Sequence, residues 1–223
     1  MTDTSYKWHS LSDLQQKIAK AAKISGRKSA DISLVAISKT RSADEIRPLL
    51  KSGHRIFGEN RVQEAQQKWP ELRTEYPDVQ LHFVGQLQSN KADEAVALFD
   101  VIHSVDRPSL VQALSKAMKK QNRQIPCFIQ VNIGEELQKG GCDIADLVPL
   151  IDISRSAGIE VKGLMCVPPA GASPIPYFAL LAKLAKDHDL DGLSMGMSSD
   201  FETAVKLGAT HLRVGTALFG QRK

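Results

Sequence analysis

The fold of this chain is decided by the stretch LVAISKT, residues 34–40, in which a short apolar run leads to a lysine, Lys39. Because the run is apolar on both sides of the pleat, it predicts a strand buried on both faces, as in parallel sheets covered by helices. Ser42 and Glu45 follow at the spacing of a capping box, so a helix is predicted to begin directly after the run. Lys39 is therefore expected at the carboxyl end of a parallel strand, where α/β proteins place their chemistry.

Two interpretations of Lys39 are open at this point. A partly desolvated lysine loses its proton more readily than a solvated one, and its neutral amine can form a Schiff base with a carbonyl group. Most lysines at strand ends simply point to water, however, because lysine is seldom buried. The rest of the sequence must distinguish the two.

Outward from this stretch, strand and helix signals alternate along the chain. A helical pattern over residues 11–24 comes first. Seven helical stretches then separate eight strand candidates, at residues 34–38, 55–57, 81–84, 101–103, 127–132, 161–166, 192–195 and 211–214. This count predicts an α/β fold, a closed (β/α)8 TIM-type barrel, with an open doubly wound sheet as the alternative. The proline-rich segment 168–176 follows a strand and is interpreted as a rim loop, because dense prolines prevent a helix from starting.

The composition is typical of a globular protein. The 223 residues can bury one large core, and we expect a single domain over residues 1–223. The net charge of +4 is compatible with anionic ligands, but aromatic residues that could stack on bases make up only 5% of the chain. No apolar run approaches the roughly 20 residues that span a bilayer, and the first residues lack the apolar core of a signal peptide. We therefore expect a cytoplasmic protein that binds neither nucleic acid nor a membrane.

Several kinds of site are not predicted. Cys127, Cys142 and Cys166 have no Cys-x-x-Cys spacing, so we expect reduced, structural thiols and neither a disulfide framework nor a metal site. The sequence also lacks Gly-x-Gly-x-x-Gly, a Walker loop and His-Glu-x-x-His. Nucleotide-binding and metalloprotease functions therefore lose their main support.

Two segments near the end of the sequence indicate a phosphate site. The run SMGMSSDFE, residues 194–202, leads from the seventh predicted strand into a helix, with Ser199 and Glu202 at capping-box spacing. Backbone N–H groups at such a helix start attract an anion. Gly215 and Thr216 follow the eighth strand, where the glycine permits close approach to a ligand and the threonine adds a hydroxyl. Each segment alone is typical of a helix cap, but loops after strands seven and eight are the usual phosphate site of (β/α)8 proteins.

Polar residues also follow the second, third and fifth predicted strands. Asn60 could hydrogen-bond a ligand hydroxyl or cap the next helix. His82 alternates with apolar residues and is interpreted as a buried imidazole of the barrel interior. The charged segment 132–141 is interpreted as a rim loop, with no catalytic role for Glu135 or Glu136.

A lysine on the first strand and a phosphate site on the last two describe a ligand with an aldehyde at one end and a phosphate at the other. Pyridoxal 5′-phosphate (PLP) fits this description. From Leu34 to Gly220 the sequence also resembles the pyridoxal phosphate homeostasis proteins, single-domain relatives of the amino-terminal barrel of alanine racemase. The resemblance rests on LVAISK at 34–39, FGENRVQE at 57–64, HFVGQLQSNK at 82–91, GLM at 163–165, MGMSSD at 195–200 and RVGTALFG at 213–220.

The resemblance implies the barrel of PLP fold type III and a role for each site residue. It implies that Lys39 carries the cofactor as an aldimine and that Arg213 faces the pyridine nitrogen. The phosphate is then held by Ser198, Ser199, Gly215 and Thr216. Asn60 completes the set of residues that we expect to bind the cofactor.

The function implied by the resemblance is PLP homeostasis: a monomer that binds PLP and buffers it or delivers it to PLP-dependent apoenzymes, without turnover of a substrate and with no catalytic residue. The alternative is a PLP-dependent amino-acid racemase, which in this fold needs a second domain that brings a tyrosine, whereas only three residues follow Gly220 here. A phosphate-binding barrel without aldehyde chemistry would leave Lys39 unused. The sequence departs from the family in a shorter loop at 168–176 and in its last residues, 221–223, neither of which touches the cofactor motifs.

Overall fold

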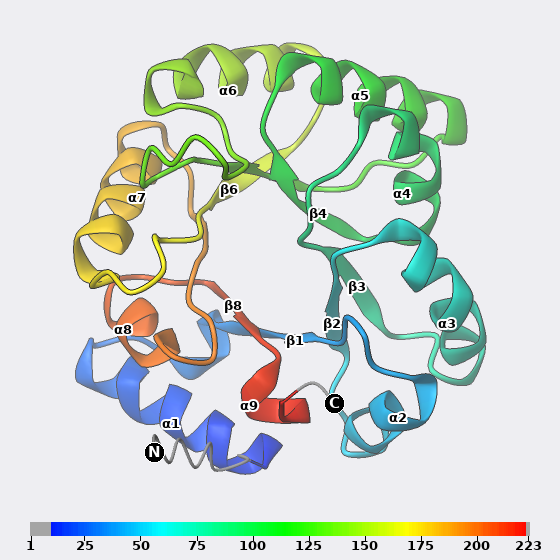
Figure 1. Cartoon of the computed structure of the whole chain (residues 1–223), viewed down its shortest axis with the longest axis vertical. Helices are drawn as coiled ribbons and strands as arrows, with labels where there is room; N and C mark the ends of the chain where they lie inside the picture. Colours follow the sequence, from blue (N-terminus) through cyan, green and yellow to red (C-terminus); the bar gives the residue numbers. More distant parts are fainter. Residues whose placement is uncertain (1–9, 222–223) are drawn as a thin grey trace.

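Eight parallel strands form a closed barrel in the computed structural model, which describes residues 10–221. Each strand pairs with the next one in the chain, and the last strand pairs with the first, so that Val35 lies opposite Arg213. The strands are β1 (Ser33–Ile37), β2 (Ile56–Glu59), β3 (Gln80–Phe83), β4 (Val101–Val105), β5 (Cys127–Gln130), β6 (Val161–Met165), β7 (Gly192–Ser194) and β8 (His211–Val214). The closed ring, seen from one end in Figure 1, confirms the (β/α)8 barrel and excludes the open doubly wound sheet.

Helices surround the ring of strands on its outer side (Figure 1). They are α1 (Leu11–Ile24), α2 (Ala43–Lys51), α3 (Val62–Glu75), α4 (Ala92–Leu98), α5 (Pro108–Gln121), α6 (Leu147–Ser156), α7 (Ile175–Asp187), α8 (Phe201–Lys206) and α9 (Thr216–Phe219), with short 3-10 helices η1 (Ser29–Asp31), η2 (Ser89–Lys91) and η3 (Ile144–Asp146). The leading helix α1 lies against α8, as Figure 1 also shows, and so covers the seam where the first and last strands meet.

The start of α2 has the capping box expected from the sequence. The Ser42 hydroxyl accepts the N–H of Glu45 at 3.3 Å, and the Glu45 carboxylate accepts the N–H of Ser42 at 2.9 Å. Both N–H groups are thereby paired at a helix end that would otherwise leave them open. The helix therefore begins at a fixed point only a few residues after Lys39.

Two expectations about helix starts are wrong. Helix α8 has Asp200, not Ser199, as its N-cap, and Asp200 makes no side-chain capping bond; its carboxylate accepts the N–H of Met197 at 2.6 Å in the turn before the helix. Helix α7 begins at Ile175, inside the segment interpreted as a rim loop. Pro176 lies in its first turn, where a proline is tolerated because no N–H is needed there.

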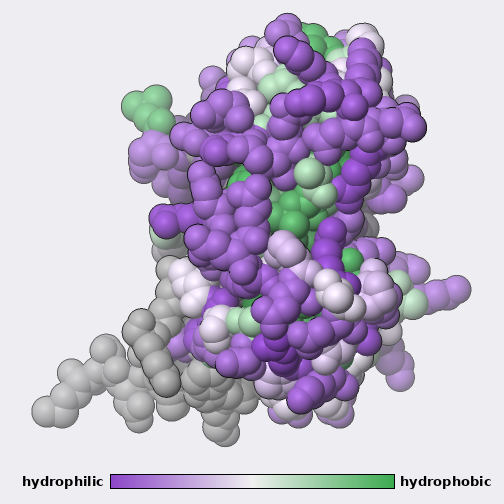
Figure 2. Space-filling model, turned by 90° about the vertical axis from the view of Figure 1, so that its right-hand side faces the viewer, coloured by the Kyte–Doolittle hydropathy of each residue, from purple (hydrophilic) through white to green (hydrophobic). Residues whose placement is uncertain are grey.

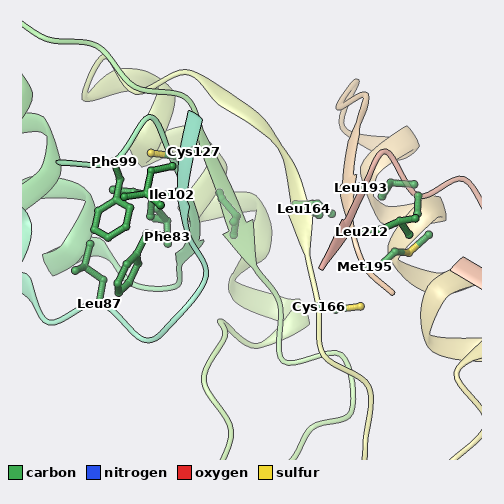
Figure 3. Close-up of a cluster of buried hydrophobic side chains, with 14 of the residues drawn as sticks. Phe83, Leu87, Phe99, Ile102, Cys127, Leu164, Cys166, Leu193, Met195 and Leu212 are labelled. Carbon is green, nitrogen blue, oxygen red and sulfur yellow. The ribbon is translucent and has the colours of Figure 1, made fainter. Parts of the chain in front are cut away.

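The hydrophobic core lies between the outer faces of the strands and the helices. Trp69, Phe99 and Phe178 are among its fully buried large side chains. Figure 3 shows two parts of this core: one gathers Phe83, Leu87, Phe99 and Ile102, and the other gathers Leu193, Met195 and Leu212. Because side chains alternate along a strand, the remaining strand residues point into the barrel. There the side chains in contact are polar as well as aromatic, namely His82, His103, Phe128 and His211.

Cys127, Cys142 and Cys166 are buried and free, as expected for structural thiols, and burial raises the pKa of each to about 12, so they stay protonated. Within residues 10–221, no cluster of histidine, cysteine or acidic side chains is arranged to hold a metal ion. None of the helices between residues 10 and 221 combines the length and the apolar character that a membrane span requires.

The outer face over α3 and α4 is mainly hydrophilic, with hydrophobic residues gathered in a hollow near its middle (Figure 2).

Candidate functional site

A cavity of about 500 Å³ lies at the carboxyl ends of the strands. It brings together all seven residues singled out from the sequence: Lys39, Asn60, Ser198, Ser199, Arg213, Gly215 and Thr216. All but Arg213, which belongs to β8, come from the segments that follow β1, β2, β7 and β8. The other lining residues are apolar or glycine: Ile37, Val84, Gly85, Val167 and Met197. No carboxylate is among these lining residues, so the cavity offers cations and hydrogen-bond donors suited to an anion.

Lys39 lies half-buried in a tight turn between β1 and α2. The N–H of Arg41 donates to the carbonyl oxygen of Ser38 at 3.0 Å, and Thr40 adopts a φ of +63°. This left-handed conformation is unfavourable for a β-branched residue. Such a residue persists only where its surroundings fix it, and strain of this kind is common at ligand sites.

Lys68, on α3, supplies that fixation. Its ammonium donates to the carbonyl oxygens of Ser38 at 2.8 Å and Arg41 at 3.1 Å, and so ties both ends of the turn that holds Lys39. It also donates to Oε1 of Glu64 at 2.8 Å, and that atom accepts the N–H of Thr40 at 2.5 Å. Only 9% of the Lys68 side chain is exposed. The strained turn is therefore held by a buried cation and its carboxylate partner.

Glu59, the last residue of β2, completes this cluster behind the cavity. Its Oε1 atom accepts the Ser38 hydroxyl at 2.6 Å and the Trp69 indole N–H at 3.0 Å, and it lies 2.9 Å from the Lys68 ammonium. The side chain is fully buried, and burial raises the pKa of the Glu59 carboxyl, although Lys68 and the two donors oppose this shift. Glu59 does not line the cavity, so its charge balances Lys68 rather than a ligand.

Arg213 projects from β8 into the barrel and is 5% exposed. Its Nη1 atom donates to the Ser194 hydroxyl at 2.8 Å, and Nη2 donates to the carbonyl oxygen of Cys166 at 2.8 Å. Burial lowers the pKa of its guanidinium, while the nearby Cys166 and Asp200 raise it. No carboxylate in the described part of the chain forms an ion pair with Arg213, so its positive charge is available to the cavity that it lines.

The segments after β7 and β8 meet at the outer end of the cavity. The Ser198 hydroxyl accepts the N–H of Ala217 at 3.2 Å and so joins the two segments. Gly196 has a φ of +92°, and a Cβ there would lie 2.5 Å from the Cβ of Ala204. Only glycine allows this turn to approach α8 so closely. Ser199 and Thr216 are exposed beside it and can reach a ligand without losing an existing buried partner.

Asn60 belongs to the site and not to a helix cap. The N-cap of α3 is Arg61, which makes no side-chain capping bond, so the capping interpretation of Asn60 is wrong. Its backbone passes so close to Gly85 that a Cβ on Gly85 would lie 2.1 Å from the Asn60 carbonyl oxygen. The absence of a side chain at Gly85 thus lets the segments after β2 and β3 meet beside the cavity.

A second cavity, of about 490 Å³, lies at the amino ends of the strands. Its lining includes the first residues of four strands: Ser33 of β1, Gln80 of β3, Val101 of β4 and His211 of β8. None of the residues singled out as a cofactor site lines it. Because (β/α)8 proteins carry their chemistry at the carboxyl ends, we assign the candidate site to the first cavity.

Comparison with known proteins supports the barrel fold described above. The chain matches the family described as alanine racemase, N-terminal domain, over residues 10–223. It is 38% identical to the pyridoxal phosphate homeostasis protein of Aquifex aeolicus, over 96% of this chain and 97% of that protein. This chain belongs to the pyridoxal phosphate homeostasis proteins. The family member from Escherichia coli strain K12 is 34% identical, with 96% of each chain covered.

Solved structures agree with membership in this family. PipY of Synechococcus elongatus, solved with PLP bound, superposes with a TM-score of 0.80 at 40% identity, covering 91% of this chain and 100% of that one. Alanine racemase of Clostridium difficile shares the fold, with a TM-score of 0.69 at 14% identity over 94% of this chain and 57% of that one. The resemblance inferred from the motifs is therefore confirmed at the level of family and fold.

Proposed function

We propose that this homeostasis protein binds PLP in the carboxyl-end cavity through Lys39, and that it buffers the cofactor or delivers it to PLP-dependent apoenzymes. The observation that carries this proposal is the lining of the cavity: one lysine, one arginine, hydroxyl groups and an amide surround it, and no carboxylate does. A cavity of about 500 Å³ is also of the size that holds a small cofactor. The family's name and the PLP-bound PipY structure support it.

Each lining group suits one part of PLP. When bound, PLP supplies an aldehyde that an amine such as that of Lys39 can join covalently. Ser198, Ser199, Gly215 and Thr216 would hold the phosphate, since hydroxyl and backbone donors form strong bonds to a charged acceptor. Arg213 would face the ring nitrogen and Asn60 a ring substituent.

We propose that the protein turns over no substrate. Arginine keeps its proton, so Arg213 can only donate to the ring nitrogen, and no lining carboxylate is available to keep that nitrogen protonated. The racemase alternative needs a tyrosine as a second acid or base. Tyr76 and Tyr177 are the tyrosines among residues 10–221, and neither lines the cavity. We further propose that the chain acts in the cytoplasm as a monomer, with one PLP-binding domain over residues 1–223.

A spectroscopic and labelling experiment tests the proposal. Added PLP should give a bound spectrum distinct from that of free PLP, and borohydride should fix it to the peptide that contains Lys39. Lys39→Ala should abolish both signals. Lys162→Ala, which removes a lysine from the lining of the amino-end cavity, should leave them unchanged. Fixation to another lysine would contradict the role of Lys39, and an unchanged spectrum would favour a phosphate-binding barrel.

A further inference from the structure

A line of hydrogen bonds runs from Arg213 through the interior of the barrel. The Ser194 hydroxyl, which accepts from Arg213, lies 2.7 Å from Nδ1 of His103. Nε2 of His103 in turn lies 2.9 Å from Nδ1 of His82. All four residues are buried, and they come from the four strands β8, β7, β4 and β3. The line therefore crosses the barrel from the carboxyl-end cavity, which Arg213 lines, towards the amino-end cavity, which His82 lines.

The charge of Arg213 restricts the direction of the hydrogen bonds along this line. A guanidinium can only donate, so the Ser194 oxygen must accept from it. The hydroxyl proton of Ser194 then has one acceptor in its described contacts, Nδ1 of His103. With Nδ1 accepting, a neutral His103 carries its proton on Nε2 and donates it to Nδ1 of His82. His82 in turn carries its proton on Nε2, a buried atom with no hydrogen-bond partner.

The reverse direction leaves more groups unpaired. If His103 donated from Nδ1, the Ser194 hydroxyl proton would have no acceptor and Nε2 of His82 would be a bare, unpaired acceptor. The forward direction leaves only one group unpaired, the Nε2–H of His82. Because each unpaired buried group is costly, the forward direction is preferred.

From this geometry we propose that His103 is a positioning residue for Arg213 and, resting on the proposed function, sets the aim of the guanidinium at the ring nitrogen of PLP. A serine hydroxyl rotates, and its hydrogen could turn towards Arg213 and repel it. The acceptor on His103 holds that hydrogen away and keeps a lone pair directed at Nη1. His103 cannot turn in its place, because it stacks on Phe128 with ring centroids 4.5 Å apart and is bonded to His82.

Because Ser194 and His103 are neutral, their hydrogen bonds leave the positive charge of Arg213 in place. A carboxylate in the place of Ser194 would orient Arg213 but would also neutralise it. Ser194 and His103 orient the guanidinium through neutral acceptors, as does the carbonyl oxygen of Cys166. The positive charge of Arg213 is therefore oriented without being cancelled.

The test compares the affinities of protein variants for PLP and for its 1-deaza analogue, which has a C–H group in place of the ring nitrogen. His103→Phe fills the same space but removes both hydrogen bonds. We expect it to weaken PLP binding about tenfold or more, the effect of one lost or misaligned bond to a charged group, while affinity for the analogue changes little. His103→Asn retains an oxygen near the Nδ1 position that can accept from Ser194, and should restore most of the affinity for PLP.

Two further variants make the outcome specific. His211→Phe changes another histidine of the barrel interior that has no bond to Ser194 or Arg213, and should preserve the preference for PLP over the analogue. Ser194→Ala should cause the same selective loss as His103→Phe, and it provides the comparison if His103→Phe fails to fold. Thermal unfolding of each variant reports general damage.

Equal losses for PLP and the analogue in both variants, or no loss, would overturn the role of His103. Arg213→Gln separates this result from a failure of the site itself. If Arg213→Gln loses PLP selectively while His103→Phe and Ser194→Ala do not, the positioning role alone is wrong. If the wild-type protein binds no PLP, the proposed function is wrong and the positioning role with it.

Discussion

The ammonium of Lys68 lies 2.8 Å from the carbonyl oxygen of Ser38 and thereby holds the residue that precedes Lys39. It is also 2.9 Å from Oε1 of Glu59, which is fully buried. One side chain thus anchors the turn of the candidate reactive lysine and neutralises a buried carboxylate. These two roles are separable by mutation.

Lys68→Met should destabilise the protein and weaken PLP binding together. The change leaves Glu59 as an uncompensated buried charge, which typically costs about 3–5 kcal/mol of unfolding free energy. It also releases the Ser38 and Arg41 carbonyls, so the turn around Thr40 loses its anchor. Urea unfolding and PLP titration measure the two effects.

Adding Glu59→Gln to Lys68→Met should restore stability more than it restores PLP binding, since it removes the buried charge but not the loose turn. Lys183→Met serves as a matched control, because Lys183 pairs with Asp187 on an exposed part of α7. It should change neither property noticeably. A Lys68→Met protein with unaltered PLP affinity would contradict the anchoring role.

Thr216→Ala combined with Ser198→Ala should weaken PLP binding far more than binding of unphosphorylated pyridoxal. Each charge-assisted bond to phosphate is worth about 1.5–3 kcal/mol, and pyridoxal cannot form it. Competition titrations with the two ligands give the ratio of losses. If both ligands lose affinity equally, the phosphate lies elsewhere.

Stability should fall as the pH is lowered from about 6.5, the ordinary histidine pKa in an unfolded chain. Burial lowers the pKa of His82 to about 3 and that of His211 to about 4, and it lowers the pKa of His103 well below the ordinary value. Between these values and about 6.5 the unfolded chain binds protons that the folded barrel does not. The unfolding free energy therefore falls by up to about 1.4 kcal/mol per pH unit for each such histidine.

Urea unfolding between about pH 7 and pH 5 checks this dependence, and His82→Asn removes one of the groups responsible. The variant should show a shallower loss of stability with falling pH than the wild type. An identical slope in the two proteins would mean that His82 takes up no proton on unfolding.

Amino acids should not be turned over by the PLP-loaded protein. Lys39 can supply one acid or base, but no tyrosine among the described residues lines the cavity to supply a second, and a positioned acid or base contributes about 10²–10⁴-fold to a rate. Incubation with L-alanine and other amino acids in deuterated water, followed by analysis of α-proton exchange and chirality, measures this. Turnover that disappears in Lys39→Ala would establish the racemase alternative.

The barrel is predictable from the sequence because each of its strands and helix starts is marked by a few neighbouring residues. Each buried strand is a short apolar run, and Ser42 and Glu45 mark a helix start within four residues. The gathering of Lys39, Asn60 and Thr216 also follows from local signals, since all parallel strands of a barrel end at the same rim. Patterns of this kind need no knowledge of which strand meets which across the interior.

Contacts across the interior could not be predicted in the same way. Ser194 and His103 are 91 residues apart, and Lys68 is 30 residues from Ser38. Lys68 follows Glu64 at a spacing common on exposed helix faces, so nothing in the sequence marks it as buried. The N-cap of α8 is mispredicted for a local reason instead: serine and aspartate are both good N-caps, so the sequence does not decide between Ser199 and Asp200, which is the N-cap in the structure.

The pairing of β1 with β8 has a consequence for the synthesis of the protein. The cavity joins Lys39, near the start of the chain, to Thr216, near its end, and the ring closes only when the last strand reaches the first. A growing chain on the ribosome therefore carries its candidate reactive lysine long before it has a place to hold a phosphate. Capture of a small molecule by this cavity would mark a chain synthesised at least as far as residue 216, and a chain cut before residue 211 would have the lysine but no complete site.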